Sequence, residues 1–152
     1  MLRQSQKRAM KTLDPNRSRI MRAVRSKDTK PELEVRRLLF SLGYRYRLHC
    51  KDLAGSPDLV FPGRRKVIFV HGCFWHGHDC PRGARKPATN AAYWEKKVGR
   101  NRVRDRSVLE ALTASGWSVE VVWECELRLA NRSTLLIRLE KFLGPCRSRD
   151  RK

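Results

Sequence analysis

KVIFVHGCFWHGHDC, residues 66–80, joins an apolar run to a segment rich in cysteine, histidine and aromatic residues. The apolar part, 66–70, is rich in β-branched side chains, and such a run predicts a buried strand. The ten residues after it hold two of the five cysteines and three of the four histidines. Active sites are commonly built on rigid elements, so we expect metal-binding and acid/base groups at the end of a central strand.

The residues just before this stretch predict its strand partner. Two hydrophobic runs, 57–61 and 66–70, flank the turn sequence PGRR, which favours a β-hairpin. The expected pairing sets Asp58 opposite Val70 or His71. A carboxylate would then lie at the mouth of the histidine-rich segment.

The other elements alternate between helix and strand patterns. Thr29 to Glu32 form a capping-box pattern, and apolar residues at helical spacing follow until Gly43. Further patterns predict a strand at 44–48, a helix beginning near residue 90 and running past 109, a strand at 118–123 and a helix ending at Gly144. We therefore expect an α/β domain with a mixed central β-sheet flanked by helices.

Length and charge define the domain organisation. A chain of 152 residues with 40% hydrophobic content fits one domain with one core. We expect a basic flexible arm at 1–18, the domain at 19–143 and a basic tail at 144–152. Lys and Arg outnumber Asp and Glu by 35 to 15, and such an excess favours nucleic acid as a partner. The arm is either a solubilising tail or a contact to the phosphate backbone.

Location and cysteine use follow from composition. No apolar run approaches the ~20 residues of a membrane-spanning helix, and no hydrophobic signal region follows the N-terminus. We expect a cytoplasmic protein without a membrane partner. Five cysteines without a disulfide spacing favour metal ligation or plain burial in a reducing compartment.

The cysteine and histidine residues form a candidate zinc site. Cys73, His78 and Cys80 lie within eight residues of one another, and Cys125 follows the last predicted strand. Four thiolate and imidazole ligands are typical of a structural zinc ion. The alternative is that the cysteines are reduced and buried while the histidine lies at the surface.

Further residues are candidates for hydrolytic chemistry. His76, two residues from His78, would face away from the metal and is suited to act as a general base near neutral pH. Asp58 follows a proline, as in nuclease magnesium sites, although an aspartate in a turn is the default interpretation. Glu32 either assists this site or only caps its helix.

The aromatic residues between the zinc candidates predict a wedge. Phe74 and Trp75 are adjacent on a short loop and cannot easily both be buried in one core. Exposed aromatic residues on a basic protein favour insertion between bases, which bends the duplex. Trp94, after a basic loop, is a candidate for the same role or for helix packing.

Taken in order, these motifs resemble a known family. The segments "HGCFWHGHDC" (71–80), "YWEKK" (93–97), "RNRVRDR" (100–106) and "GWSVEVVWEC" (116–125) are similar to those of the very short patch repair endonucleases, and the resemblance covers about residues 17–143. It implies a restriction-endonuclease-like fold. It also implies a bacterial, nucleoid-associated enzyme that nicks one strand of duplex DNA beside the thymine of a T:G mispair left by deaminated 5-methylcytosine.

The resemblance also implies roles for individual residues. Mg²⁺ would be held by Asp58 and Val70, water would be activated by His76, and His71 would lie near the phosphate. Glu32 would assist indirectly. The zinc ligands would be Cys73, His78, Cys80 and Cys125, and the intercalating residues would be Phe74, Trp75 and Trp94.

Some relatives carry threonine where this chain has Val70. We expect the backbone carbonyl to be the ligand there, because a valine side chain in an apolar strand packs inward.

Two other functions stay open, a non-catalytic zinc-containing DNA-binding module and a restriction-type endonuclease. We expect a monomer, since an asymmetric lesion requires no two-fold symmetry. The sequence leaves open the preferred bases around the mismatch, the choice of histidine as base and the recruitment of mismatch-repair proteins.

Overall fold

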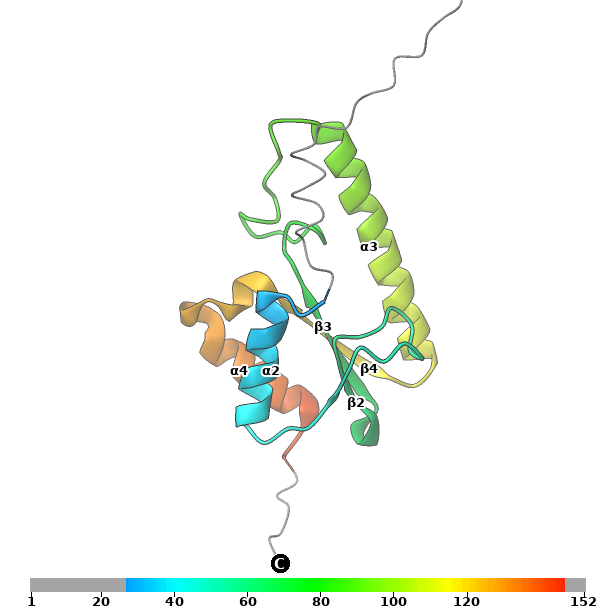
Figure 1. Ribbon diagram of the computed structural model, residues 1–152, viewed down its shortest axis with the longest axis vertical. Helices are drawn as coiled ribbons and strands as arrows, with labels where there is room; N and C mark the ends of the chain where they lie inside the picture. Colours follow the sequence, from blue (N-terminus) through cyan, green and yellow to red (C-terminus); the bar gives the residue numbers. More distant parts are fainter. Residues whose placement is uncertain (1–26, 147–152) are drawn as a thin grey trace, which may run out of the picture.

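The computed structural model describes residues 27–146, and Figure 1 shows their arrangement. The expected basic arm at 1–18 and most of the basic tail lie outside the described residues. None of the described helices is long and apolar enough to cross a membrane.

The centre of the fold is a four-stranded sheet with the order β1-β2-β3-β4. Its strands are β1 (Arg47–Leu48), β2 (Leu59–Phe61), β3 (Lys66–His71) and β4 (Ser118–Trp123). The first three pair antiparallel, whereas β4 runs parallel to β3. Parallel neighbours need a long crossover connection, which is provided here by the helix α3 (Ala91–Ala114). The expected mixed sheet is therefore confirmed.

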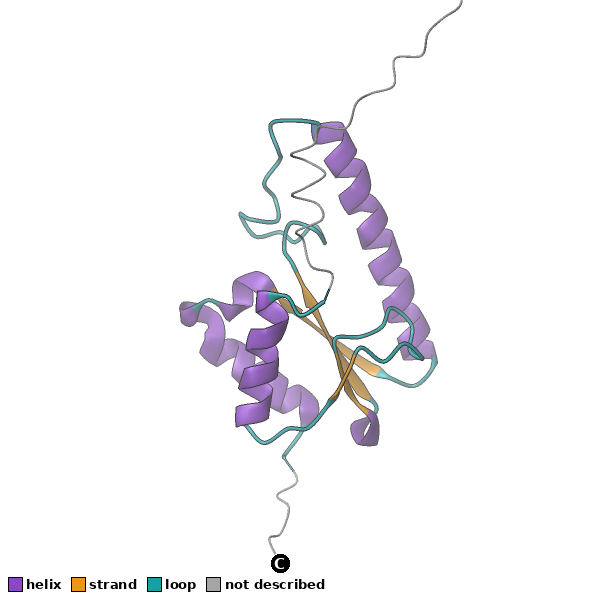
Figure 2. Cartoon of the chain, in the orientation of Figure 1, coloured by secondary structure: helices purple, strands orange, loops and turns teal. Residues whose placement is uncertain are grey.

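Helices cover both faces of the sheet (Figures 1 and 2). The helices α2 (Lys30–Ser41) and α4 (Leu129–Leu143) pack on one face, and buried residues of both belong to one core cluster with β2, β3 and β4. On the other face, Leu112 of α3 packs with residues of β2 and β3 in a second cluster. These two layers hold β3 at the centre of the molecule, where five of its six residues are buried.

Helix α2 begins as the capping pattern predicts. Thr29 accepts a hydrogen bond from the backbone N–H of Glu32, and its own hydroxyl donates to Glu32 Oε1 at 3.0 Å. The helix gives way at Gly43, whose φ of +92° favours glycine. This cap fixes the end of α2 that lies nearest to Asp58.

Two expectations about the strands are wrong in detail. The strand expected at 44–48 is reduced to two residues, because the hydroxyl of Tyr44 donates to the carbonyl of Gly144 and that of Tyr46 donates to the carbonyl of Arg36. These bonds turn both rings toward the helices and away from a regular ladder. In the hairpin, Leu59 pairs with Ile68, so Asp58 falls opposite residue 69 and not opposite Val70 or His71.

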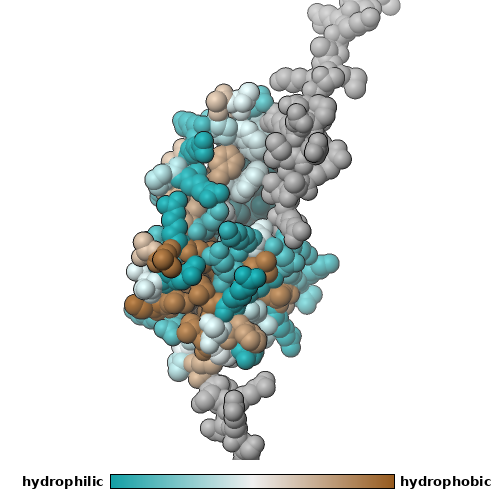
Figure 3. Space-filling model, turned by 60° about the vertical axis from the view of Figure 1, so that its left-hand side comes forward, coloured by the Kyte–Doolittle hydropathy of each residue, from teal (hydrophilic) through white to brown (hydrophobic). Residues whose placement is uncertain are grey.

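The surface differs in polarity between the two ends of the molecule. On the face drawn in Figure 3, hydrophobic side chains gather in the lower half, and the upper part is mainly hydrophilic. The exposed large hydrophobic residues include Phe40 of α2 and Leu129 and Ile137 of α4. The upper part, where α3 begins in Figure 1, is the more polar end.

Candidate active site and metal centre

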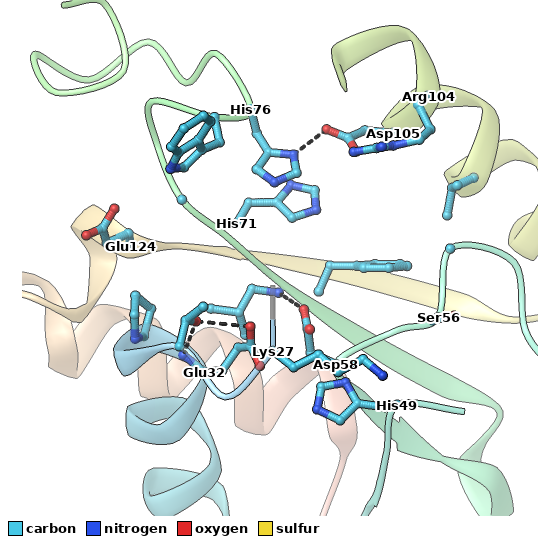
Figure 4. Close-up of a pocket in the computed structure, with 18 of the residues that line it drawn as sticks. Lys27, Glu32, His49, Ser56, Asp58, His71, His76, Arg104, Asp105 and Glu124 are labelled. Carbon is cyan, nitrogen blue, oxygen red and sulfur yellow. Dashed lines mark hydrogen bonds and ion pairs between the residues drawn. The ribbon is translucent and has the colours of Figure 1, made fainter. Parts of the chain in front are cut away.

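A pocket of about 750 Å³ opens beside the carboxyl end of β3, between α2 and α3 (Figure 4). All the residues that the sequence assigned to catalysis line it. They are Glu32, Asp58, Val70, His71 and His76. The structure therefore brings together five candidates from α2, the β2–β3 hairpin and the loop after β3.

Asp58 is held in the pocket by the backbone of β3. Its Oδ2 accepts a hydrogen bond from the N–H of Val70 at 2.7 Å, so the side chain crosses the one-residue offset in the hairpin. The pKa of Asp58 is raised to about 6, mainly by burial and also by the nearby Glu32 carboxylate, although the Val70 bond and the charges of His49 and Arg36 act in the opposite direction. A carboxylate this costly to ionise favours a cation as partner.

Val70 presents its backbone to Asp58 and its side chain to the core. The side chain belongs to the cluster that includes Val35 and Leu39 of α2. In a strand, the N–H and C=O of one residue point to the same side, and the N–H of Val70 points at Asp58. The Val70 carbonyl therefore also faces Asp58. Two hard oxygen donors on one side of a buried pocket fit Mg²⁺, which prefers carboxylate and carbonyl ligands.

His76 is oriented by a residue that the sequence analysis left without a role. Its Nδ1 lies 2.6 Å from Oδ2 of Asp105 on α3. A carboxylate accepts and does not donate, so Nδ1 carries the proton and Nε2 of a neutral ring is left to accept one. This arrangement is typical of a general base with an orienting carboxylate.

His71 stacks directly on His76. The two rings are parallel within 5°, with their centroids 3.8 Å apart. The pKa of His71 is lowered to about 4, mainly by burial and also by the neighbouring His76. His71 is therefore neutral at pH 7, so it can offer a hydrogen bond to a phosphate but no positive charge.

Glu32 is placed for both of the roles considered for it, capping α2 and assisting the metal site. Its carboxylate accepts the N–H of Asp28 at 3.0 Å and a bond from Arg36 Nη2 at 3.2 Å, in addition to the Thr29 hydroxyl. Only 4% of the residue is exposed, yet it lines the pocket. It therefore caps α2 and also adds negative charge beside Asp58.

A second cluster lies beyond the pocket, on the loop after β3 and at the end of β4. It consists of Cys73, His78, Cys80 and Cys125, whose ligand atoms all lie within 4.8 Å of one another. Tetrahedral zinc places thiolate sulfur at ~2.3 Å and imidazole nitrogen at ~2.0 Å, so these four side chains can close around one ion. Burial raises the pKa of the Cys73 thiol to about 12, and a bound cation would offset that cost. The donor set fits structural zinc.

The aromatic residues form one cluster above this loop. Phe74, Trp75 and Trp94 make edge-to-face contacts with ring centroids 5.3–5.7 Å apart, and each is half-buried. The Nζ of Lys97 lies 5.4 Å from the ring centroids of Trp75 and Trp94. The three candidate wedge residues, from two distant segments, are thus placed side by side.

Comparison with known proteins identifies the family. A sequence profile described as DNA mismatch endonuclease Vsr matches residues 10–82, which include Asp58, His71 and His76. The DNA mismatch endonuclease Vsr of Escherichia coli is 42% identical over 130 residues, which cover 84% of this chain and 83% of that protein. The chain belongs to the Vsr family.

Other Vsr-like relatives are named as nicking enzymes. The type II nicking enzyme V.XorIIP of Xanthomonas oryzae pv. oryzae is 54% identical over 134 residues, 88% of this chain and 96% of its own. The type II nicking enzyme V.NmeAIP of Neisseria meningitidis is 42% identical over 127 residues, 84% of this chain and 89% of its own. As a member of the Vsr family, the chain is a mismatch endonuclease, a hydrolase that acts on DNA.

Proposed function

We propose that this endonuclease nicks one strand of duplex DNA beside the thymine of a T:G mispair, by Mg²⁺-dependent hydrolysis in the pocket described above. One observation carries the proposal. A histidine with a carboxylate on its Nδ1 at 2.6 Å shares a pocket with a buried carboxylate that faces a strand carbonyl. A general base and an oxygen-rich cation site in one pocket are what phosphodiester hydrolysis needs.

Mg²⁺ would be held by Asp58 and the carbonyl of Val70. When bound, it supplies a positive charge that stabilises the phosphate oxygens and the leaving oxygen. Glu32 acts from outside this pair: its carboxylate is already bonded by three donors, so it shapes the local charge and holds the first turn of α2 against the pocket.

His76 takes the proton in the hydrolytic step. A water molecule attacks phosphorus, its proton passes to Nε2 of His76, and the bond from phosphorus to the leaving oxygen breaks as that oxygen takes a proton from a solvent water. Asp105 keeps the ring in the required tautomer and stabilises the imidazolium that forms. His71, neutral and stacked on His76, packs the ring in place and offers an N–H to the phosphate.

Selectivity for the mispair follows from the aromatic cluster. A T:G wobble pair is weakly stacked, so inserting Phe74, Trp75 and Trp94 beside it costs less than opening a paired step. Zinc at the cysteine cluster would hold the loop that carries two of these rings. The same loop carries His76, so insertion and hydrolysis are linked through one rigid segment.

The decisive experiment compares one duplex in matched and T:G-mispaired form. Single-turnover cleavage with Mg²⁺ should nick the thymine strand of the mispaired duplex at least about 10²-fold faster than the matched duplex. Asp58→Ala should abolish nicking while binding to the mispaired duplex persists. Cleavage of both strands of the matched duplex would instead identify a restriction-type endonuclease.

A purely DNA-binding module would behave differently from both enzymes. It would bind the mispaired duplex without cutting it, and Asp58→Ala would change nothing.

We also propose that the enzyme acts as a monomer, since the lesion is asymmetric. Light scattering of the protein bound to one duplex should give the mass of a one-to-one complex.

A further inference from the structure

Three cations line the pocket among the residues that the structure describes, and they differ in their surroundings. They are Lys27, Arg82 and Arg104. Arg82 is paired with Glu124 at 3.3 Å, and Lys27 lies beside Glu32 on the Asp58 side of the pocket (Figure 4). Arg104 lies on the opposite wall, next to Asp105 and near the stacked histidine rings. Arg104 thus lies on the same side of the pocket as His76.

Arg104 is oriented by a short chain of hydrogen bonds. Its Nη2 donates to Oδ1 of Asn101 at 3.3 Å, and Nδ2 of Asn101 donates to the backbone carbonyl of Trp75 at 2.8 Å. Both ends of the Asn101 amide are thereby used. A guanidinium has five N–H donors, and the bond to Asn101 uses one of them.

The spacing on α3 explains why this cation faces the reaction. Asn101, Arg104 and Asp105 stand at positions i, i+3 and i+4, which share one face of a helix. Asn101 and Asp105 hold two consecutive loop residues, Trp75 by its carbonyl and His76 by its ring. Arg104 stands between these two residues on the helix and donates to one of them, Asn101, at 3.3 Å.

We propose that Arg104 is a catalytic residue that binds the nonbridging oxygens of the phosphate cleaved in this pocket. A planar guanidinium binds phosphate through two parallel N–H···O bonds. Negative charge on these oxygens grows as water attacks phosphorus, so a fixed cation there stabilises the transition state more than the bound substrate. The inference rests on the proposed placement of the reaction in this pocket.

The first test measures the single-turnover rate at saturating enzyme on the duplex that the wild-type protein nicks. Arg104→Ala should slow the reaction roughly 10²–10³-fold. The rate of Arg104→Lys should fall between those of the wild type and Arg104→Ala, because lysine keeps the charge but loses the two parallel N–H donors. Arg106→Ala is the matched control, since Arg106 is exposed on the same helix, does not line the pocket and gives the same change in charge. It should weaken binding a few-fold and leave the saturated rate unchanged. Equal rates for the Ala variants at 104 and 106 would overturn the proposal.

The second test needs no cleavage and no magnesium. Replacing one nonbridging oxygen of the scissile phosphate by a methyl group removes its charge. The wild-type protein and Arg106→Ala should both lose affinity for that duplex, whereas Arg104→Ala should bind the normal and the methylated duplex almost equally. If Arg104→Ala remains as sensitive to the methyl group as the wild type, Arg104 does not contact this phosphate.

Two controls separate a role of Arg104 in catalysis from a loss of folding and from a failure of the proposed T:G function. Thermal melting and zinc content of each variant show whether it is folded, and Arg104→Lys provides a milder change if the alanine variant is unstable. A wild-type protein that nicks matched duplexes as fast as mispaired ones would contradict the proposed T:G function and still allow both Arg104 tests.

Discussion

Asp58 and His71 lie in one pocket, and burial changes their pKa values in opposite directions. Both shifts disfavour the charged form, so the carboxyl has its pKa raised to about 6 and the imidazole has its pKa lowered to about 4. Each group therefore changes the free energy of unfolding with pH in a different direction, and single substitutions can separate the two contributions.

Asp58→Asn should stabilise the protein when magnesium is absent. Between pH 3.8 and about 6 the folded state binds more protons at Asp58 than the unfolded state, so the free energy of unfolding falls as pH rises through this window. At pH 7.5 the full cost of the buried charge is present. Urea denaturation in magnesium-free buffer should show a gain of roughly 1–3 kcal/mol for the variant. The exposed Asp52→Asn should stay within about 0.5 kcal/mol of the wild type, and a destabilised Asp58→Asn would contradict the argument.

His71→Gln should make the protein less sensitive to acid. The unfolded state binds a proton at His71 below pH 6.5, and the folded state does so only near pH 4, so the free energy of unfolding falls as the pH decreases between these values. Denaturation curves at pH 7 and pH 5 should show a smaller loss for the variant than for the wild type. Equal losses would mean that His71 is protonated in the folded protein.

Asp105→Asn should slow cleavage without unfolding the protein. An amide can present its NH₂ group to Nδ1 and favour the wrong tautomer of His76, a change that costs roughly 10²–10⁴ in rate in comparable dyads. Single-turnover cleavage of the T:G duplex measures the effect, with Asp52→Asn as the control of equal charge. A variant that cleaves at the wild-type rate would remove Asp105 from the mechanism.

The residues that could be predicted from the sequence are those marked by a local pattern. Asp58 follows a proline before a strand, and His71 and His76 lie in one ten-residue segment with the cysteines. Asp105 has no such mark, because its partner His76 is 29 positions away and the contact depends on how α3 crosses the loop. The only signal was its place in "RNRVRDR", where one acid stands among many bases.

At the scale of elements, strand β3 determines the site through its backbone. Its apolar run was predictable, because a fully buried strand needs no polar alternation. The one-residue offset of the hairpin was not predictable, since register depends on the turn at Pro62–Arg64, a short 3-10 helix with Arg65 in the left-handed region. The side chain of Asp58 compensates for this offset by reaching the N–H of Val70.

Val70→Thr tests whether the backbone or the side chain of this strand serves the site. Because the valine side chain is buried in the core and the carbonyl faces Asp58, cleavage of the T:G duplex should remain within a few-fold of wild type. Val70→Ala, which also keeps the carbonyl, serves as the control for packing. A large gain in activity for the threonine variant would show that a hydroxyl ligand is needed there.

Cys125→Ser tests the cluster that joins the β3 loop to the end of β4. Losing one of the four proposed zinc ligands should lower the zinc content measured by mass spectrometry, reduce the melting temperature and slow cleavage, since the loop carries His76 and two of the proposed wedge residues. Cys146→Ser removes an exposed cysteine outside the cluster and should change none of these. Full metal content in Cys125→Ser would exclude it as a ligand.

For the whole molecule, the formal net charge of +20 supports DNA binding without sequence information. Counterion release makes such binding weaken steeply with salt. Raising the salt from 50 to 200 mM should weaken binding to matched and T:G duplexes in parallel, by roughly 10³- to 10⁵-fold if six to ten phosphates are contacted. The ratio of the two affinities should change little. A ratio that collapses with salt would mean that charge, and not the aromatic wedge, distinguishes the mispair.

Pairing of β3 with β4 has a consequence for the newly made enzyme. The two strands are adjacent in the sheet, yet β4 and Cys125 come about fifty positions later in the chain, after the whole of α3. A nascent polypeptide that has left the ribosome only as far as α3 lacks both β4, the neighbour of β3, and Cys125, the third thiol of the cluster. Both the sheet and the cysteine cluster are therefore completed only when the last quarter of the chain has been made.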